Sequence, residues 1–392
     1  MRVALLSLSM ALAAAVVVSP GCAYNYAVRG VKAETRALWV TRWDYKRPAD
    51  IRLIMERARR VHFNVVFFQV RGNADAFYPS RYEPWGEELG GRNPGFDPLG
   101  VAIREAHGRG LELHAYLNVM TGWKGSAPPR SQRHLWRAHR AWFTRDVYGA
   151  PQPLDDGYLQ LSPGLRPVRD HIVNVVADVA RRYPVDGIHL DYVRYLSERY
   201  SYDPVSVSVF RRATGRRPAD LPGSWQAYRR SLVTRLVRRI RDALRAIKPG
   251  LPLSAAVLGH MEEARVTYGQ DVAQWLAEDL IDVSYPMIYE DDYRAFAAQL
   301  SDHLRASAGK PVYPGIGVYR HDGPPQTLRQ LALARTFGVQ GFAVFDYRSL
   351  FGVVNADGTP DYVKPGVGPR IVRAMLLGPL ARRVPPAVRR KP

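Results

Sequence analysis

The chain contains very little cysteine and no recognised cofactor or metal motif. Cys22 is the single cysteine among 392 residues, so no disulfide can form within the chain. No Gly-rich dinucleotide loop follows the first predicted strand, and no HxH or HExxH spacing is present to hold a metal. We therefore expect neither a metal nor any other cofactor.

Acidic residues are scarce relative to basic ones. The chain has 56 Lys and Arg but only 36 Asp and Glu, which gives a net charge of +20. Such a positive field attracts anionic polymers or membrane surfaces. The arginines are spread through predicted helices and do not form one basic, aromatic-interleaved element, so we expect no nucleic acid partner. A solvated arginine-rich surface explains the same excess.

The N-terminus has the pattern of an export signal. A basic start at Arg2 precedes an apolar run over residues 3–18, and small residues follow up to Cys22. This arrangement is typical of a signal peptide and not of a spanning helix. We therefore interpret residues 1–22 as an export signal, and expect the protein in the periplasm or at the cell surface.

Cys22 stands where a bacterial lipoprotein carries its lipid. Ser19 and Pro20, however, occupy positions where a lipobox has an aliphatic and a small residue. Two outcomes stay open: lipidation at Cys22, or simple cleavage near Ala23 or Ala27. A lipid at Cys22 would be the protein's contact with the membrane.

From residue 36 onward, short β-type runs alternate with longer amphipathic segments, the pattern of a parallel sheet with crossover helices. The sequence predicts helices at 49–61, 98–107, 168–182, 225–247, 272–278, 293–306 and 327–337. It predicts eight strands, at 37–45, 64–71, 111–118, 187–195, 253–258, 281–290, 312–318 and 341–347. We therefore predict an α/β fold, a single (β/α)8 TIM barrel over residues 34–350. Residues 351–392 form a C-terminal extension with a basic Pro/Arg tail, and we expect a monomer.

Three of the predicted connections are long. They follow the second, third and fourth strands, at 72–97, 119–166 and 196–224, and are rich in Trp, Tyr, Pro and charge. In a barrel these loops lie at the C-terminal face, where active sites are built. We expect them to form the walls of a cleft.

Three carboxylates at predicted strand ends are candidate catalytic residues. Asp191 shares a strand face with Gly187 and His189, and Arg194 follows closely enough to hold it ionised. Glu290 ends the sixth strand and Asp346 the eighth. Alternation along these strands predicts that both point into the barrel mouth.

Cleavage of a glycosidic bond needs one protonated carboxyl as acid and one ionised carboxyl as nucleophile or base. Asp191, beside Arg194, suits the ionised role. Asp291 and Asp292 follow Glu290, so we expect a raised pKa at Glu290 and assign it the acid role.

Polar and aromatic residues near the predicted cleft are candidates for sugar binding, since sugar rings stack on aromatic faces and are held by planar polar groups. Pairs two or four residues apart share a strand face, and a lone histidine is otherwise most often a core residue. The candidates are Gln69, Arg71, Tyr78, His114, Asn118, Trp123, His189, Arg194 and Tyr289.

Several runs resemble the bacterial glycosyl-hydrolase-like family ten. They are ETRALWV (34–40), FQVRGNADAFYPS (68–80), FDPL (96–99), EAHGRGLELHAYLN (105–118) and DGIHLDYVRY (186–195). The resemblance spans residues 34 to 350. It implies a barrel and an extracytoplasmic glycosidase, with peptidoglycan glycan strands as the best-supported substrate of the wider family.

The chain departs from that family at two of the candidate carboxylates. PMIYE (286–290) stands where the family often has Pro-Gln-x-Tyr-Trp, and its last strand usually ends without a carboxylate at Asp346. The catalytic role of Asp191 is thus supported both by the strand pattern and by the family resemblance. The roles of Glu290 and Asp346 are supported by the strand pattern alone. The sequence predicts a glycoside hydrolase; a non-catalytic polysaccharide-binding or cell-wall-binding barrel is the alternative.

Overall fold

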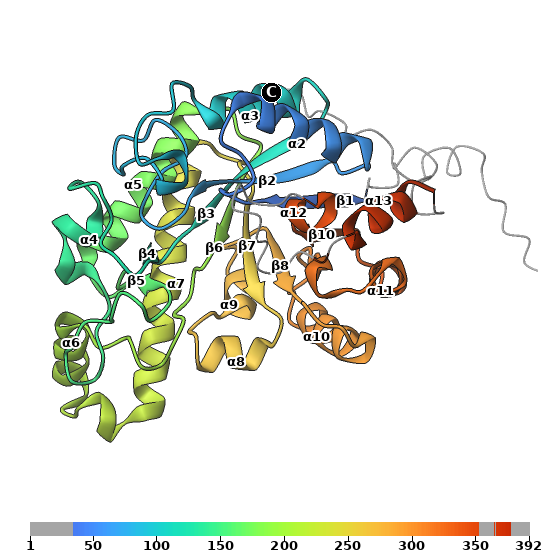
Figure 1. The fold of residues 1–392 in the computed structure, drawn as a ribbon. Helices are drawn as coiled ribbons and strands as arrows, with labels where there is room; N and C mark the ends of the chain where they lie inside the picture. Colours follow the sequence, from blue (N-terminus) through green and yellow to red (C-terminus); the bar gives the residue numbers. More distant parts are fainter. Residues whose placement is uncertain (1–33, 353–363, 365, 378–392) are drawn as a thin grey trace, which may run out of the picture. The chain divides into compact units, whose positions relative to one another are not determined.

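The computed structural model describes residues 34–352, 364 and 366–377. Eight parallel strands close a barrel in the order β1-β10-β9-β8-β7-β6-β3-β2. The predicted (β/α)8 barrel is confirmed, with each of its eight strands. Figure 1 shows the strands at the centre with helices around them. The strands are β1 (Thr35–Val40), β2 (Val65–Arg71), β3 (Glu112–Asn118), β6 (Gly187–Asp191), β7 (Leu253–Leu258), β8 (Val283–Met287), β9 (Gly315–Gly317) and β10 (Gly341–Phe345).

Helices follow the strands and surround them (Figure 1). Seven were predicted within a few residues: α2 (Pro48–Arg60), α3 (Pro98–His107), α5 (Arg166–Arg182), α7 (Pro222–Ile247), α9 (Val272–Ala277), α10 (Tyr293–Arg305) and α11 (Pro324–Thr336). Five were not: α4 (Leu135–Ala138), α6 (Pro204–Thr214), α8 (Met261–Val266), α12 (Tyr347–Phe351) and α13 (Val367–Leu377). The loops after β3 and β6 thus contain short helices.

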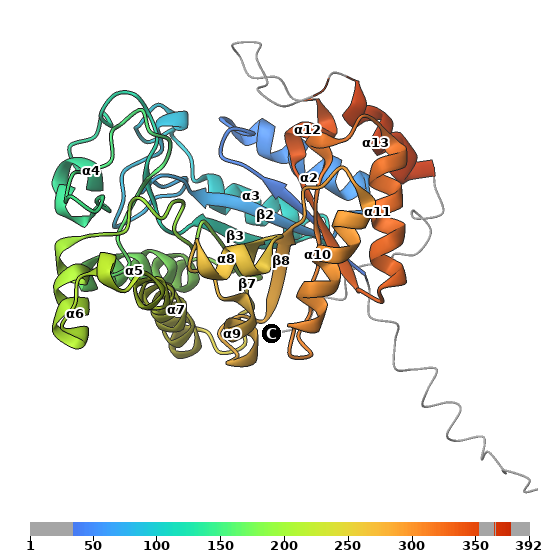
Figure 2. The same ribbon diagram turned by 90° about the horizontal axis from the view of Figure 1, so that it is seen from below.

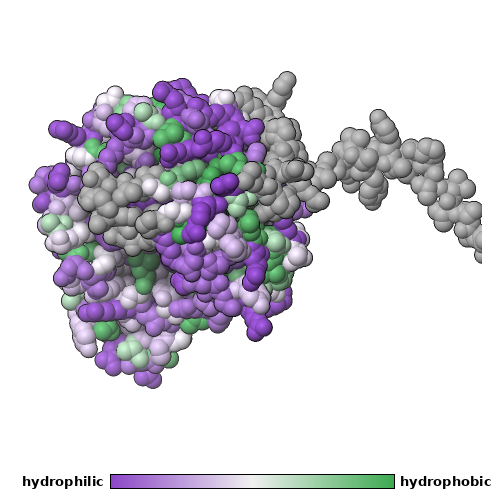
Figure 3. All heavy atoms as spheres, turned by 45° about the vertical axis from the view of Figure 1, so that its right-hand side comes forward, coloured by the Kyte–Doolittle hydropathy of each residue, from purple (hydrophilic) through white to green (hydrophobic). Residues whose placement is uncertain are grey.

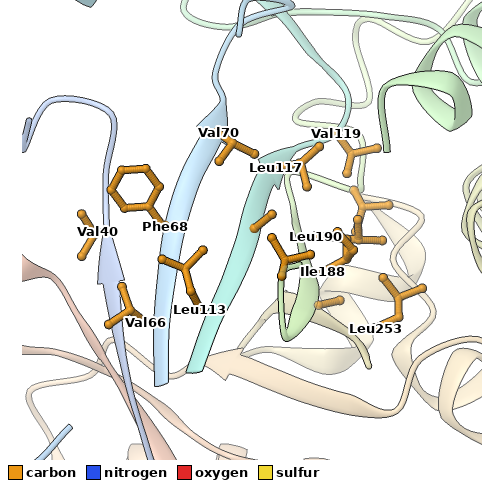
Figure 4. Close-up of a cluster of buried hydrophobic side chains, with 14 of the residues drawn as sticks. Val40, Val66, Phe68, Val70, Leu113, Leu117, Val119, Ile188, Leu190 and Leu253 are labelled. Carbon is orange, nitrogen blue, oxygen red and sulfur yellow. The ribbon is translucent and has the colours of Figure 1, made fainter. Parts of the chain in front are cut away.

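Buried side chains form two layers on either side of the barrel wall. Alternate residues on six strands meet in the barrel interior, among them Trp39, Phe67, Tyr116 and Tyr285. The residues between them, such as Phe68, face the helices (Figure 4). The two clusters therefore show the parity of each strand, that is, which alternate residues point into the barrel and which point toward the helices.

This parity corrects the prediction for two strands. On β8 the interior residues are Val283, Tyr285 and Met287, and on β10 they are Ala343 and Phe345. The prediction had placed the opposite set inside, because it took small and polar residues as the interior face. The interior is instead filled by aromatic side chains, so Glu290 and Asp346 have outward parity.

The segment between β3 and α5 carries a small antiparallel sheet of β4 (Thr121–Trp123) and β5 (Leu159–Gln160), together with α4. In both ribbon views α4 and α6 lie on one side of the strands, and α11 and α13 lie on the other (Figures 1 and 2). The two long insertions after β3 and β6 are therefore neighbours in space.

The surface in Figure 3 is largely hydrophilic, with scattered hydrophobic side chains. No helix in the described part of the chain is long and apolar enough to cross a membrane. The predicted signal at 1–22, Cys22 itself and the basic tail at 382–392 lie outside the described residues.

Candidate active site

Asp191 ends β6 at the C-terminal face of the barrel, and its side chain is 8% exposed. Its Oδ2 accepts a hydrogen bond of 2.9 Å from the hydroxyl of Tyr116 on β3. Its Oδ1 accepts one of 2.6 Å from the N–H of Tyr192, and Arg194 Nη1 lies 3.6 Å from the same oxygen. A carboxyl group is thus held in one orientation by three neighbours.

The electrostatics of Asp191 differ from the prediction. Burial raises the pKa of Asp191, and this effect outweighs the opposing charge of Arg194 and the two donated hydrogen bonds. The expectation that Arg194 holds this pKa low was therefore wrong in its net direction, although Arg194 does lie beside the carboxyl. A raised pKa makes the Asp191 carboxylate a stronger base than an exposed one.

Three further buried polar atoms at this end of the barrel have no hydrogen-bond partner among the described residues. They are Asn118 Oδ1, Arg194 Nη1 and Tyr289 Oη. Asn118 pairs in register with Asp191, while burial and then the charge of Asp191 raise the pKa of Tyr289. Buried polar groups nearly always have partners in folded proteins. An acceptor, a cation and a hydroxyl around one carboxyl form a suitable site for a polyhydroxylated ligand.

Tyr192, directly after Asp191, has a left-handed backbone with φ 49°. This conformation costs a non-glycine residue about 1–3 kcal/mol and is concentrated at functional sites. The Tyr192 ring lies 5.2 Å from the ring of Tyr158, and the guanidinium of Arg194 lies 4.8 Å from its centre. The bend at Tyr192 thus places an aromatic wall beside the carboxyl.

Glu290 lies at the same face but is not crowded by its acidic neighbours. Its Oε1 accepts a hydrogen bond of 2.8 Å from Gln299, and its side chain is 29% exposed. Asp291 pairs with Arg320 at 3.1 Å, and Asp292 caps the N-terminus of α10. The expected crowding of Glu290 by Asp291 and Asp292 was therefore wrong, because both neighbours are engaged elsewhere.

Asp346 is fully buried and caps α12, accepting hydrogen bonds from the backbone N–H and the hydroxyl of Ser349. It lies near Asp44, whose pKa is raised to about 7 by burial and by the charge of Asp346, against the opposing charge of Arg348. The structure thus places Asp346 in a helix cap and in a buried charge cluster. It does not point into the mouth of the barrel as predicted.

Gln69 and Arg71 have the predicted inward parity, but their polar groups are already used. Gln69 Oε1 accepts from the N–H of Arg42 at 2.9 Å. Arg71 is 1% exposed, pairs with Glu83 at 2.8 Å, and donates to the carbonyls of Asn118 and other residues after β3. Both side chains therefore hold loops in place through these contacts.

His189 is a core residue and was wrongly predicted to bind substrate. Its Nε2 accepts from the indole N–H of Trp39 at 3.0 Å, and its Nδ1 lies 2.9 Å from Ser254 Oγ. The ring stacks on Phe67 at 3.9 Å, and burial lowers the pKa of His189 well below its usual value. A neutral imidazole with both nitrogens bonded completes the barrel interior.

His114 lies near the opposite end of the barrel from Asp191. Its Nε2 is 3.5 Å from Glu112, the first residue of β3, and it packs on Gly187, the first residue of β6. A Cβ at Gly187 would come within 2.4 Å of the His114 ring, so only glycine fits there. The prediction that His114 binds substrate failed because it considered only the shared strand face. His114 lies four residues before Asn118 along β3, a distance of about 13 Å.

The two remaining aromatic candidates are packed inside the protein. Tyr78 is fully buried and meets the ring of Tyr183 after α5. Trp123 on β4 is 7% exposed, packs on His134 and donates its indole N–H to the carbonyl of Ala127. Both therefore stabilise loops near the face. The structure brings Asn118, Arg194 and Tyr289 to Asp191, but not these two rings.

Tyr116 and Arg42 are site residues that the sequence reasoning missed. Tyr116 donates to Asp191, and Arg42 is buried, pairs with Glu88 and lies 3.8 Å over the half-exposed ring of Trp43. Tyr116 lies between His114 and Asn118 on the same face of β3, so the alternation along this strand could have identified it as a site residue. Arg42 follows the end of β1 and gave none.

Within the described residues, no group of three or more His, Cys, Asp or Glu side chains is arranged to hold a metal ion. The polar groups at this face are the carboxyl of Asp191, the phenols of Tyr116 and Tyr289, the amide of Asn118 and the guanidinium of Arg194.

A closed (β/α)8 barrel with a buried carboxyl at a strand end is the architecture of many glycoside hydrolases. The chain belongs to the glycosyl hydrolase-like 10 family, whose sequence model matches residues 34–319. The family resemblance found in the sequence is thereby confirmed.

Two curated relatives extend this comparison. Glycosyl hydrolase YngK of Bacillus subtilis (strain 168) is 26% identical over 399 residues, which cover 86% of this chain and 74% of YngK. Glycosyl hydrolase DigH of Escherichia coli (strain K12) is 28% identical over 303 residues, which cover 69% of this chain and 65% of DigH. The match thus spans just under two thirds of DigH.

Solved structures share the fold at low identity. The glycoside hydrolase domain of PgaB (BpsB) from Bordetella bronchiseptica has a TM-score of 0.64 at 14% identity, covering 81% of this chain and 96% of that domain. Alpha-L-fucosidase isoenzyme 2 from Paenibacillus thiaminolyticus also has a TM-score of 0.64, at 20% identity, covering 87% of this chain and 49% of the fucosidase. These neighbours establish the fold alone.

Proposed function

We propose that this chain hydrolyses glycosidic bonds of an extracytoplasmic polysaccharide, and that cleavage depends on Asp191. The observation that supports this is the convergence of Asn118, Arg194 and Tyr289 on a rigidly held carboxyl, since each of the three has a buried polar atom without a hydrogen-bond partner among the described residues. We propose peptidoglycan glycan strands as the substrate, because the family resemblance implies them and the charge of +20 attracts anionic polymers.

Hydrolysis requires a base or nucleophile and an acid. We assign Asp191 the first role, because Tyr116 and the N–H of Tyr192 donate to its two oxygens while burial strengthens it as a base. We assign Glu290 the acid role. Its side chain is 29% exposed on the loop after β8, so a leaving-group oxygen can reach it.

A non-catalytic polysaccharide-binding barrel is the second candidate. It is favoured by one observation: among the described inward-facing residues at the strand ends, Asp191 is the one carboxyl, so any acid has to come from a loop. A binding protein needs the aromatic wall at Tyr192 and the polar atoms around Asp191, but no second carboxyl.

Incubation of purified protein with denuded peptidoglycan and other bacterial polysaccharides distinguishes the two. New reducing ends that disappear in Asp191→Asn support hydrolysis. The matched control is Asp302→Asn, which makes the same change at a surface carboxyl on α10 that pairs with Arg305. Polysaccharide binding without product, unchanged in Asp191→Asn, supports the binding barrel instead.

We also propose that the protein is exported, as residues 1–22 suggest, and that it works as a monomer at the cell surface or in the periplasm. A lipid on Cys22 or cleavage at a nearby alanine both fit this proposal.

A further inference from the structure

The insertion between β3 and α5 contains a shallow hollow apart from the residues around Asp191. Its apolar lining includes Trp136, Phe143 and Pro151, and its polar lining includes Arg140 and Arg145. Its enclosed volume is only about 10 Å³, room for a single water molecule, and the rest of the hollow is open to solvent. A saccharide unit would therefore lie across the mouth of the hollow, largely exposed to water, and contact the side chains that line it.

The cations of this hollow are available to a ligand. Arg140 lies 3.7 Å from the ring centre of Trp136, and a guanidinium stacked on an indole keeps the N–H groups of its edge free to donate. Arg145 donates one N–H to the carbonyl of Gly149. Neither arginine has a carboxylate within ion-pair distance in the described part of the chain.

Thr144 adds a buried polar group to the same lining. Its residue is 1% exposed, and its hydroxyl has no hydrogen-bond partner among residues 34–352 or the described part of 364–377. Two guanidinium groups without a carboxylate partner among the described residues, an indole and a buried hydroxyl suit a sugar ring that carries a negative charge. A neutral sugar would use the indole and the hydroxyl but leave both guanidinium groups without a counter-charge.

The hollow is joined to the candidate active site through Gln160. Gln160 lines the hollow, donates to the carbonyl of Arg194 at 2.8 Å and accepts from the N–H of Leu196 at 2.8 Å. Arg194 in turn lies 3.6 Å from Asp191. A single side chain thus connects the floor of the hollow to the loop that carries Arg194.

We propose that this hollow is an accessory subsite for an anionic saccharide unit. Its role as a subsite rests on the proposed function: the acidic unit belongs to the glycan chain whose bond lies at Asp191. Arg140 and Arg145 bind the negative group, and Trp136 and Phe143 contact the ring. The subsite gives the enzyme a preference for acidic over neutral glycans.

The test uses 19F NMR of the full chain labelled with 5-fluorotryptophan, in an Asp191→Asn background that prevents turnover. The chain has 8 tryptophans, and the Trp136 signal is assigned by its loss in Trp136→Phe. The probes are the disaccharide of N-acetylglucosamine and N-acetylmuramic acid, glucose 6-phosphate, and neutral chitobiose. The first two compare a carboxylate with a phosphate as the negative group.

We expect the Trp136 signal to shift saturably with an acidic probe and not with chitobiose. Arg140→Gln and, independently, Arg145→Gln should weaken this binding about ten-fold, the loss expected for a charged hydrogen bond. The matched control is Arg133→Gln, which removes the same charge from an exposed position in the same insertion and should leave the affinity unchanged. An unchanged melting temperature shows that each variant is folded.

The subsite is refuted if the Trp136 signal does not move, if chitobiose moves it equally, or if Arg133→Gln weakens binding as much as Arg140→Gln. Reducing-end assays on the wild-type chain are scored separately. Acid-specific binding without cleavage retains the subsite and removes the hydrolase. Cleavage without a shift at Trp136 retains the hydrolase and removes the subsite.

Discussion

The ion pair between Arg71 and Glu83 determines how the loop beside Asp191 is held. The two side chains are 1% and 0% exposed, and Arg71 donates to Glu83 from Nε at 3.0 Å and from Nη2 at 2.8 Å. Glu83 also lies 3.0 Å from His171 on α5. Replacement of Glu83 by Gln leaves a buried cation without its counter-charge, so we predict a large loss of stability.

The size of this loss follows from two independent arguments. Removal of one partner of a buried pair costs about 3–5 kcal/mol. Burial alone would raise the pKa of Glu83, but the charge of Arg71 and the contact with His171 lower it from 4.5 to about 2. At about 1.4 kcal/mol per pKa unit this shift is about 3 kcal/mol. We therefore predict that Glu83→Gln lowers the free energy of unfolding by about 3 kcal/mol at pH 7.

The pH dependence has a definite sign. Because the pKa of Glu83 is lower in the folded chain than in the unfolded chain, the stabilisation is complete above about 4.5 and is lost as pH falls toward 2. Urea unfolding followed by tryptophan fluorescence measures both chains from pH 7 down to pH 3. The difference between wild type and Glu83→Gln should shrink over the acidic half of this range.

Glu278→Gln is the matched control, since Glu278 pairs with Arg238 at the surface, where both side chains are at least 40% exposed. Exposed pairs contribute little, so this variant should unfold like the wild type. If Glu83→Gln is as stable as Glu278→Gln at pH 7, or if its deficit is the same at pH 3, the pair does not stabilise the loop as argued.

Three further predictions concern catalysis, pH and export. Glu290→Gln should slow substrates with poor leaving groups by roughly 10²–10⁴ and spare activated aryl glycosides, whereas Asp191→Asn should abolish both; intact polymer cleavage in Glu290→Gln places the acid elsewhere. The pKa of Asp44 is higher in the folded chain than in the unfolded chain, so folding stability should fall as pH rises from 3.8 to about 7. The melting temperature of Asp44→Asn should fall less than that of the wild type over this range. An equal fall of the melting temperature in both chains contradicts this prediction. Mass spectrometry of the mature protein should find its N-terminus at or shortly after Cys22, and a retained Met1 excludes export.

The barrel could be predicted from the sequence because eight apolar runs alternate with amphipathic segments. Helix α6 could have been predicted as well, since Asp203 caps it, Pro204 begins it and Gly215 ends it with φ 70°. Its moderate apolar content hid these signals. The two turns of α8 and the single turn of α4 are too short for any periodicity to appear.

The facing of side chains was predictable on some strands only. On β6 the alternation of Gly187, His189 and Asp191 with two aliphatic residues leaves one choice. On β8 every position is compatible with burial, because a barrel strand is covered on both faces and loses its alternation. From the sequence, Tyr285 could point either into the barrel or toward the helices. The prediction pointed it toward the helices, and the alternation along the strand then placed Glu290 in the barrel mouth.

Parity also says nothing about height along the barrel or about whether a polar group is free. Gln69 and Arg71 have inward parity, but the N–H of Arg42 and the carboxylate of Glu83 already occupy them. Asn118 has the same parity and an unpartnered Oδ1. Only hydrogen bonds between distant segments separate these cases, and no sequence pattern records such bonds.

This contrast divides the polar residues of the C-terminal face into supports and ligand-binding groups. A support such as Arg71 fixes the carbonyls after β3, so its removal should lower stability and activity together. Asn118 offers a free acceptor beside Asp191, so its loss should weaken substrate binding while the chain stays folded. On the proposed function, the groups that bind the glycan include those whose hydrogen-bonding capacity the described residues leave unused, as Asn118 Oδ1 does beside Asp191.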